Sequence, residues 1–245
     1  MPTNQPVGKI RWYETWPGLT IAGLVATVII GAIIFAVIVG RYYWLIRHGA
    51  GAELYAKFHA EDIAKIDPAL AALRTRLETT VSPYLGKNGA PVTIVQFMDF
   101  KCPYSKQAVA IMYQLVNKYP DKVKIIFRHF PLESLYLGTS KLSEVSYCAF
   151  RQGAFWQMFN AIYDKQSEWS EMITDAEITA LADTAGVDKN LLNECLKDPA
   201  TGVAVRADFA AGVREGVKAT PTFFVNGVRA AGVIPFSIWE GFLKK

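Results

Sequence analysis

The sequence predicts an α/β fold that follows one long apolar helix. The run VTIVQFMDF (92–100) is β-branched and apolar on both faces, which suits a strand buried in a sheet. A second strand is expected at KVKIIFRHF (122–130). Between the two strands, apolar residues recur at helical spacing, at Ala108, Ile111, Met112, Leu115 and Tyr119. Strand, helix and strand in this order indicate a βαβ unit.

Composition and charge narrow the functional classes. A chain of 245 residues is long enough for one large domain, or for one domain with an appendage. The formal charge of +4 is mild and no long basic run is present, so nucleic acid is not an expected partner. The three cysteines are too few for a disulfide scaffold and predict one pair plus one free thiol. No His and Cys cluster has metal-ligand spacing, so no metal site is expected.

The apolar helix is predicted at residues 18–40, which contain no charged residue. A helix of this length covers the hydrocarbon core of a bilayer, about 30 Å. Aromatic residues flank the run on both sides, at Trp12, Tyr13, Trp16, Tyr42, Tyr43 and Trp44. A buried core helix and a cleaved signal peptide are the alternatives, but the run is too long for a signal peptide and no clear cleavage site follows. We therefore expect a retained single-pass membrane anchor.

The charges beside this helix do not decide its orientation. Lys9 and Arg11 precede it, and Arg41 and Arg47 follow it, so the two sides carry the same number of positive charges. Small residues recur along the helix, at Gly23, Thr27 and Gly31 and at Ala32, Ala36 and Gly40. Such spacing allows close approach of two helices, and it is equally the background of any Gly- and Ala-rich span. A weak homodimer through the helix and an unpaired helix both stay open.

The rest of the chain divides into a linker and a folded domain. Residues 1–17 form a short N-terminal segment, residues 41–85 a helical stalk, and residues 86–245 the domain. Asp67 and Pro68 predict a helix start within the stalk, as N-cap and first helical residue. This helix is expected to be a solvated spacer, with docking against the domain as the alternative. The turn-forming residues 86–91 mark the domain boundary.

Cys102 lies where the first predicted strand passes into the helix. Pro103, directly after it, is preset for the first helical position. The unpaired N–H groups and the positive end of the helix dipole favour a thiolate. Cysteines in such positions have pKa values of roughly 3.5 to 7.5, against about 8.5 for a free thiol. We expect a reactive nucleophile, and an inert buried cysteine is the alternative.

A second motif lies near the end of the chain. GVKATPTFFVNG (216–227) contains Thr220 and Pro221, then a short apolar strand and the Asn226–Gly227 hairpin turn. A proline that opens a strand is either a plain edge feature or a position held by a tight constraint.

Four ordered motifs resemble the DsbA-like thiol–disulfide oxidoreductases: APVTIVQFMDFKCPYS, KVKIIFRHFPL, CAFRQGAFWQMFNAIYD and GVKATPTFFVNG. The resemblance covers about residues 82–245. It implies a thioredoxin-like fold with a helical domain inserted at about 135–216. It also implies that Cys102 is the nucleophile and that Pro221 is a cis proline facing it. Pro103, Tyr104 and Thr220 would then contact the substrate.

The resemblance also implies the location and the partners. The family acts outside the cytoplasm, so the domain would be extracytoplasmic, periplasmic or at the cell surface, with the N-terminus inside. Cysteine-containing proteins would be its substrates, a membrane redox partner is open, and no cofactor is implied. A structural disulfide between Cys148 and Cys195 is implied as well, closing a loop of about 47 residues that contributes roughly 3–4 kcal/mol in the chain-entropy model. Two separately buried cysteines are the alternative.

The match to the family fails at Ser105, where the resolving cysteine is expected. Thiol–disulfide exchange proceeds through a mixed disulfide, and a hydroxyl group cannot resolve it. Three outcomes stay open: monothiol or isomerase-like chemistry, a non-enzymatic binding or assembly subunit of a membrane complex, and a Ser105 introduced to trap a partner. In each, the Ser105 hydroxyl could hydrogen-bond the Cys102 thiolate. His129, in FRHFPL, is expected to cap or pack its strand, with tuning of the thiolate as the alternative.

Overall fold

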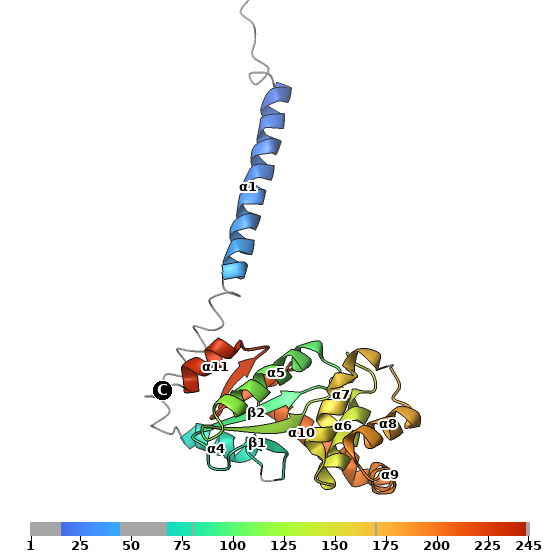
Figure 1. Cartoon of the computed structure of the whole chain (residues 1–245). Helices are drawn as coiled ribbons and strands as arrows, with labels where there is room; N and C mark the ends of the chain where they lie inside the picture. Colours follow the sequence, from blue (N-terminus) through green and yellow to red (C-terminus); the bar gives the residue numbers. More distant parts are fainter. Residues whose placement is uncertain (1–15, 45–67, 80, 170, 244–245) are drawn as a thin grey trace, which may run out of the picture. The chain divides into compact units, whose positions relative to one another are not determined.

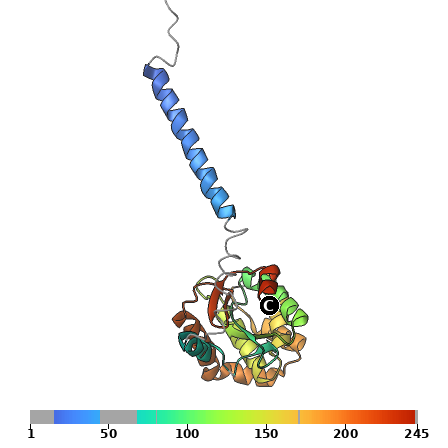
Figure 2. The same ribbon diagram turned by 90° about the vertical axis from the view of Figure 1, so that its left-hand side faces the viewer.

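The computed structural model describes residues 16–44, 68–79, 81–169 and 171–243. The chain divides into two compact units, residues 1–53 and residues 54–245, and each is described by itself. The first unit contains α1 (Trp16–Trp44), which both views show as one continuous helix (Figure 1 and Figure 2). Among the described residues, no helix meets the combined length and apolarity that a membrane crossing requires. The anchor expected at 18–40 is therefore not confirmed.

The second unit is built on one five-stranded sheet with the strand order β1-β3-β2-β4-β5. Strands β2 and β3 are parallel, and the other neighbours are antiparallel. The bounds are β1 (Tyr84–Gly86), β2 (Val92–Met98), β3 (Val123–His129), β4 (Thr222–Val225) and β5 (Val228–Ala231). Helix α5 (Pro103–Lys118) connects β2 to β3, so the predicted βαβ unit is confirmed.

The central strand β2 is buried on both faces, as its sequence predicted. One face, with Ile94 and Met98, packs in a core with α5 and α11 (Phe236–Leu243). The other face, with Val95 and Phe97, packs under Leu77 and α10 (Pro199–Arg214). Gly212 allows α10 to pack closely on this face of the sheet, since a Cβ at this position would lie within about 3 Å of the rings of Phe97 and Phe130.

The N-terminal boundary of the domain differs from the expectation. Helix α4 (Pro68–Leu77) was expected to be a spacer, yet Leu77 is fully buried against Val95 and Phe97 because its apolar side chain covers the open face of the sheet. Strand β1 precedes the expected start of the domain at residue 86, and it pairs with β3. The helix packs in the core on one face of the sheet, and the edge strand pairs with β3, so both belong to the folded domain.

The segment between β3 and β4 is helical in the residues that the structure describes, as predicted. It contains α6 (Thr139–Arg151), α7 (Phe155–Asp164), a short 3₁₀ turn (Gln166–Glu168), α8 (Asp175–Ala185), α9 (Lys189–Lys197) and α10. Helices α6 to α9 gather at the opposite end of the sheet from α11 (Figure 1). Helix α8 begins with a complete capping box of Thr174 and Glu177.

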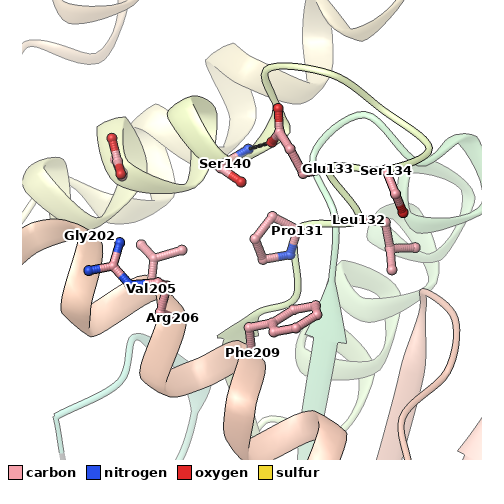
Figure 3. Close-up of a pocket in the computed structure, with 10 residues that line it drawn as sticks. Pro131, Leu132, Glu133, Ser134, Ser140, Gly202, Val205, Arg206 and Phe209 are labelled. Atoms are coloured by element: carbon pink, nitrogen blue, oxygen red, sulfur yellow. Dashed lines mark hydrogen bonds between the residues drawn. The ribbon is translucent and has the colours of Figure 1, made fainter.

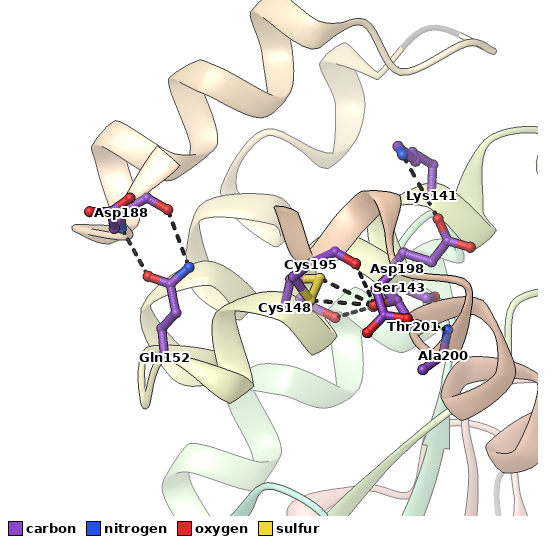
Figure 4. Close-up of a disulfide and its surroundings, with 11 residues drawn as sticks. Lys141, Ser143, Cys148, Gln152, Asp188, Cys195, Asp198, Ala200 and Thr201 are labelled. Atoms are coloured by element: carbon purple, nitrogen blue, oxygen red, sulfur yellow. Dashed lines mark hydrogen bonds and ion pairs between the residues drawn. A yellow bond between two sulfur atoms is a disulfide. The ribbon is translucent and has the colours of Figure 1, made fainter. Parts of the chain in front are cut away.

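A disulfide joins Cys148 of α6 to Cys195 of α9 (Figure 4). Cys148 is fully buried, and the hydroxyl group of Thr201 lies beside both sulfurs while it donates a hydrogen bond of 2.6 Å to the carbonyl oxygen of Cys195. The disulfide thus ties the first helix of the insert to its penultimate one at a point where α10 begins.

Removing this disulfide should lower the stability of the domain. We expect the double variant Cys148→Ala/Cys195→Ala to lose about 3–4 kcal/mol of unfolding free energy, because the unfolded chain regains the freedom of the closed loop. Urea unfolding of both proteins measures the difference. Two additional alkylatable thiols in the purified, unreduced wild-type protein would contradict the disulfide itself.

Candidate functional site

Cys102 occupies the N-cap position of α5, directly before Pro103 at the first helical position. Its backbone is extended, with φ −71° and ψ 120°, and its side chain does not cap the helix. The sulfur therefore stands at the helix N-terminus without being used by the helix, where the unpaired N–H groups and the dipole favour negative charge. Cys102 is the free cysteine of the three in the chain.

The structure brings Cys102 together with the second predicted motif. The Thr220–Pro221 peptide bond is cis and directly precedes β4. The Sγ atom of Cys102 donates a hydrogen bond of 3.2 Å to the carbonyl oxygen of Thr220. The antiparallel register of β2 and β4, which pairs Phe97 with Thr222, places these two chain reversals side by side.

Access to the sulfur is narrow. Cys102 exposes 3% of its surface, whereas Pro103 is exposed and Tyr104 exposes 58%. Thr220 is buried. Of the predicted substrate contacts, Pro103 and Tyr104 therefore present side chains to solvent, and Thr220 faces the sulfur through its backbone carbonyl. Cys102 is therefore a nearly buried residue that lies directly before two residues with exposed side chains, Pro103 and Tyr104.

Ser105, at the position where the resolving cysteine is expected, is fully buried. Its Oγ atom accepts a hydrogen bond of 3.4 Å from the backbone N–H of Asp99. The hydroxyl group of Tyr163, on α7, is a further hydrogen-bonding neighbour of Ser105. The serine is therefore part of the internal support of the turn that carries Cys102.

Asp99 was not identified as a site residue from the sequence, yet its contacts reach several segments around Cys102. Its carboxylate is fully buried and accepts hydrogen bonds from Lys101 N–H (2.7 Å), Leu132 N–H (2.6 Å) and the Thr139 hydroxyl (2.6 Å). Burial raises the pKa of this carboxyl group, and the three hydrogen bonds oppose that rise. The sequence feature that could have identified Asp99 was its place as an acidic residue at the end of an otherwise apolar predicted strand.

Two further side chains from the insert hold the same turn. The Tyr163 hydroxyl donates to the carbonyl oxygen of Asp99 at 3.1 Å, and burial raises the pKa of this phenol well above its ordinary value. The amide nitrogen of Gln166 donates to the carbonyl oxygens of Phe100 (2.8 Å) and Cys102 (3.0 Å). Both contacts bridge the helical insert and the strand-to-helix turn.

The loop after β3 closes over the other side of the turn. Lys101 Nζ donates a hydrogen bond to the carbonyl oxygen of Leu137. Tyr136 lies next to Cys102, and burial together with this neighbouring thiol raises the pKa of its hydroxyl group. Tyr104 and two leucines of this loop, Leu135 and Leu137, have exposed side chains.

His129 does not take part in the site. Its ring is buried among Phe100, Phe127 and Phe155, with ring centroids 5.0 to 6.3 Å away. Burial lowers its pKa from 6.5 to about 4, so the imidazole is neutral at physiological pH. The packing role expected from the sequence holds, and the alternative of tuning the Cys102 thiolate does not.

A separate cavity of about 420 Å³ opens between the loop after β3, α6 and α10 (Figure 3). Glu133 is fixed at its upper edge by a 2.8 Å hydrogen bond from Ser140 N–H, while Phe209 and Val205 of α10 form an apolar wall. Cys102 does not line this cavity. Among the residues that the structure describes, no group of three or more His, Cys, Asp or Glu residues is placed to hold a metal ion.

The fold and this site define a thioredoxin-like domain with a helical insertion. A family model described as thioredoxin matches residues 78–245, so the chain belongs to this thioredoxin family.

Similar proteins fall into two groups. Among curated proteins, the chain is 33% identical over 153 residues to the Na(+)/H(+) antiporter NhaA 3 of Salinispora tropica, covering 62% of this chain and 22% of the antiporter. It is 28% identical over 225 residues to the antiporter NhaA 1 of Salinispora arenicola, covering 88% of this chain and 34% of the antiporter. The chain thus spans about a third or less of the length of these relatives.

Solved structures show the same fold. A thioredoxin-like oxidoreductase from Silicibacter pomeroyi DSS-3 matches with a TM-score of 0.60 at 23% identity, covering 70% of this chain and 95% of that chain. The thiol-disulfide exchange protein alpha-DsbA2 from Wolbachia pipientis matches with a TM-score of 0.62 at 19% identity, covering 76% and 98%. The predicted thioredoxin-like fold is confirmed.

The buried histidine should make the stability of the domain depend on pH. Because the folded imidazole has a pKa of about 4, below its ordinary 6.5, its contribution is present above pH 6.5 and is lost as the pH falls towards 4. The loss over that range amounts to about 3 kcal/mol. Urea unfolding at several pH values should therefore show a shallower decline for His129→Leu than for the wild type. Equal slopes would contradict the assignment.

Proposed function

We propose that the chain is a DsbA-like thiol–disulfide exchange protein whose nucleophile is Cys102. The observation that carries this proposal is the position of the Cys102 sulfur, at the N-terminus of α5 and 3.2 Å from the carbonyl oxygen of Thr220, next to cis-Pro221. The Cys102 thiolate attacks one sulfur of a substrate disulfide. A Cys102–substrate disulfide forms, the substrate S–S bond breaks, and the second substrate sulfur leaves as a thiolate.

The reaction then needs a thiol from outside the active site. Ser105 has no sulfur, and its hydroxyl group is buried against Asp99 N–H. A thiolate of the substrate, or of a small thiol, attacks the substrate sulfur of the mixed disulfide and releases the Cys102 thiolate. Cys102 is neither oxidised nor reduced over the cycle, so the chemistry is isomerase-like or monothiol exchange.

The substrates are cysteine-containing proteins presented as an extended, accessible segment. Because Cys102 exposes only 3% of its surface, a disulfide inside a compact fold would not reach its sulfur. Pro103 and Tyr104, directly after Cys102, have exposed side chains that would contact such a segment, and Thr220 would contribute its backbone.

A second candidate function is non-enzymatic. The missing resolving thiol at position 105 and the likeness to segments of Na(+)/H(+) antiporters both favour a domain that binds or assembles with a membrane protein. In this function Cys102 would not turn over, and the site beside Thr220 would hold a peptide of the partner.

We further propose that α1 anchors the domain to a membrane, with the short N-terminus inside and the domain on the extracytoplasmic side. Two observations support the anchor. Large apolar side chains are exposed along α1 from Leu24 to Val39, and helices that are apolar all round are usually buried or membrane-embedded. The match to the Salinispora arenicola antiporter covers 88% of the chain. It is therefore longer than the thioredoxin match at residues 78–245 and includes part of the chain before residue 78.

Alkaline carbonate extraction tests the anchor. The full chain should stay in the membrane pellet, because apolar burial does not weaken at high pH, and a variant lacking residues 1–44 should be released. Release of the full chain by carbonate would contradict the anchor without affecting the proposed exchange chemistry.

Restoring the missing thiol tests the monothiol proposal. The wild type should form a lasting mixed disulfide with a peptide disulfide, whereas Ser105→Cys should release the peptide at least about tenfold faster, because the second thiol attacks within the same molecule. Non-reducing gels and mass spectrometry measure both rates.

Cys102→Ala is the control for this experiment and should form no adduct in either background. The exchange proposal fails, and the binding function is favoured, if the wild type and Cys102→Ala behave alike in adduct formation and in refolding of a scrambled disulfide protein.

A further inference from the structure

Asp99 is the buried acidic residue of the site, and each of its polar groups has a partner. Besides the three donors to its carboxylate, its backbone N–H donates to Ser105 Oγ. Its carbonyl oxygen accepts from Cys102 N–H at 3.3 Å and from the Tyr163 hydroxyl at 3.1 Å. These contacts come from the turn itself, from α5, from the loop after β3, from α6 and from α7.

Such a residue is costly to the fold. Burying a carboxylate removes its hydration, and the partners recover that loss only when their geometry is good. Apolar side chains of similar size often serve stability equally well at buried charged positions. Stability alone therefore does not explain an aspartate at this position. The explanation is the part of the site that its hydrogen bonds hold in place.

The contacts of Asp99 fix the direction of Cys102. Lys101 N–H, in the residue directly before Cys102, binds the Asp99 carboxylate, and the N–H of Cys102 itself binds the Asp99 carbonyl oxygen. Leu132 N–H and the Thr139 hydroxyl bind the start of the helical insert to the same carboxylate. The turn is thereby held against the insert on one side, and its sulfur against Thr220 on the other.

We propose that Asp99 is a positioning residue for exchange at Cys102: its buried carboxylate locks the Asp99–Cys102 turn to Leu132 and Thr139, so that the sulfur stays aligned beside Thr220. The inference rests on the proposed function, because it concerns the same nucleophile. Asp99 does not touch the reacting sulfurs. It acts through the backbone that carries Cys102.

The direction in which a substitution at Asp99 changes the reaction rate distinguishes a positioning role from an effect of its charge. A negative charge beside a thiol opposes formation of the thiolate, so removing the charge alone would accelerate attack at neutral pH. Loss of alignment slows attack at every pH, including the alkaline range where the thiol is fully ionised. The two roles of Asp99 therefore predict rate changes of opposite sign.

The experiment compares Asp99→Asn with the wild type in the reaction of Cys102 with dipyridyl disulfide, from neutral to alkaline pH. The asparagine keeps the shape but replaces one acceptor oxygen by an amide donor, which must face Leu132 N–H, or else Lys101 N–H and the Thr139 hydroxyl. We expect the rate to fall about tenfold, the loss typical of one broken hydrogen bond to a charged group. The fall should persist at alkaline pH.

Asp208→Asn is the matched control. Asp208 is also tied to a buried partner, accepting from Arg128 Nε at 2.6 Å and from His129 N–H at 3.0 Å, but it lies outside the Cys102 turn. This variant should unfold at lower urea concentration and react at the wild-type rate. A second pair isolates one contact: Thr139→Val should slow the reaction, and Thr139→Ser, which keeps the hydroxyl group, should not.

The outcomes are distinct. An unchanged or faster reaction of Asp99→Asn would overturn the proposal, as would equal rates for Thr139→Val and Thr139→Ser. If Asp99→Asn does not fold, the Thr139 pair decides. Failure of the proposed function gives a different result. In that case Cys102 of the folded wild-type protein would not react with dipyridyl disulfide, and it would react only after the protein is denatured.

Discussion

The antiparallel pairing of β2 with β4 is the constraint on which the rest of the domain depends. It places the end of β2 beside the start of β4, so that two turns far apart in sequence meet at one end of these central strands. Phe97, Phe223 and Phe224 are buried at this seam and hold it through apolar packing. Without this register, the Cys102 sulfur would not contact the Thr220 carbonyl oxygen, and Cys102 would be only a cysteine at the start of a helix.

The helical insert completes the site rather than merely covering it. Tyr163 and Gln166 donate to backbone carbonyls of the turn, while Leu132 and Thr139 donate to the carboxylate of Asp99. Directional bonds of this kind fix an orientation that apolar contact alone leaves loose. The result is a sulfur in a fixed position, on a residue that exposes 3% of its surface. Selectivity among disulfides would then come from which segments can reach it, and not from a deep binding pocket.

Local sequence signals predicted what depends on local chemistry. The strand, Cys102, Pro103 and the helical stripe after them lie within one continuous stretch, so their arrangement could be derived from periodicity and capping. Asp99 could not, because its partners at Leu132 and Thr139 lie on another segment that only the folded chain brings near. Docking of α4 was only the alternative for a related reason, since Leu73 and Leu77 at helical spacing suit a spacer and a packed helix equally well. Strand β1, three residues long, carries too little pattern to be recognised.

The central claim is that Cys102 is an accessible nucleophile in the folded protein. Intact-mass spectrometry after brief exposure of the native domain to oxidised glutathione, followed by peptide mapping, tests it most directly. We predict a single glutathionyl adduct on Cys102, with the Cys148–Cys195 disulfide intact. An adduct that forms only after unfolding, or that maps to Cys148 or Cys195, would contradict it.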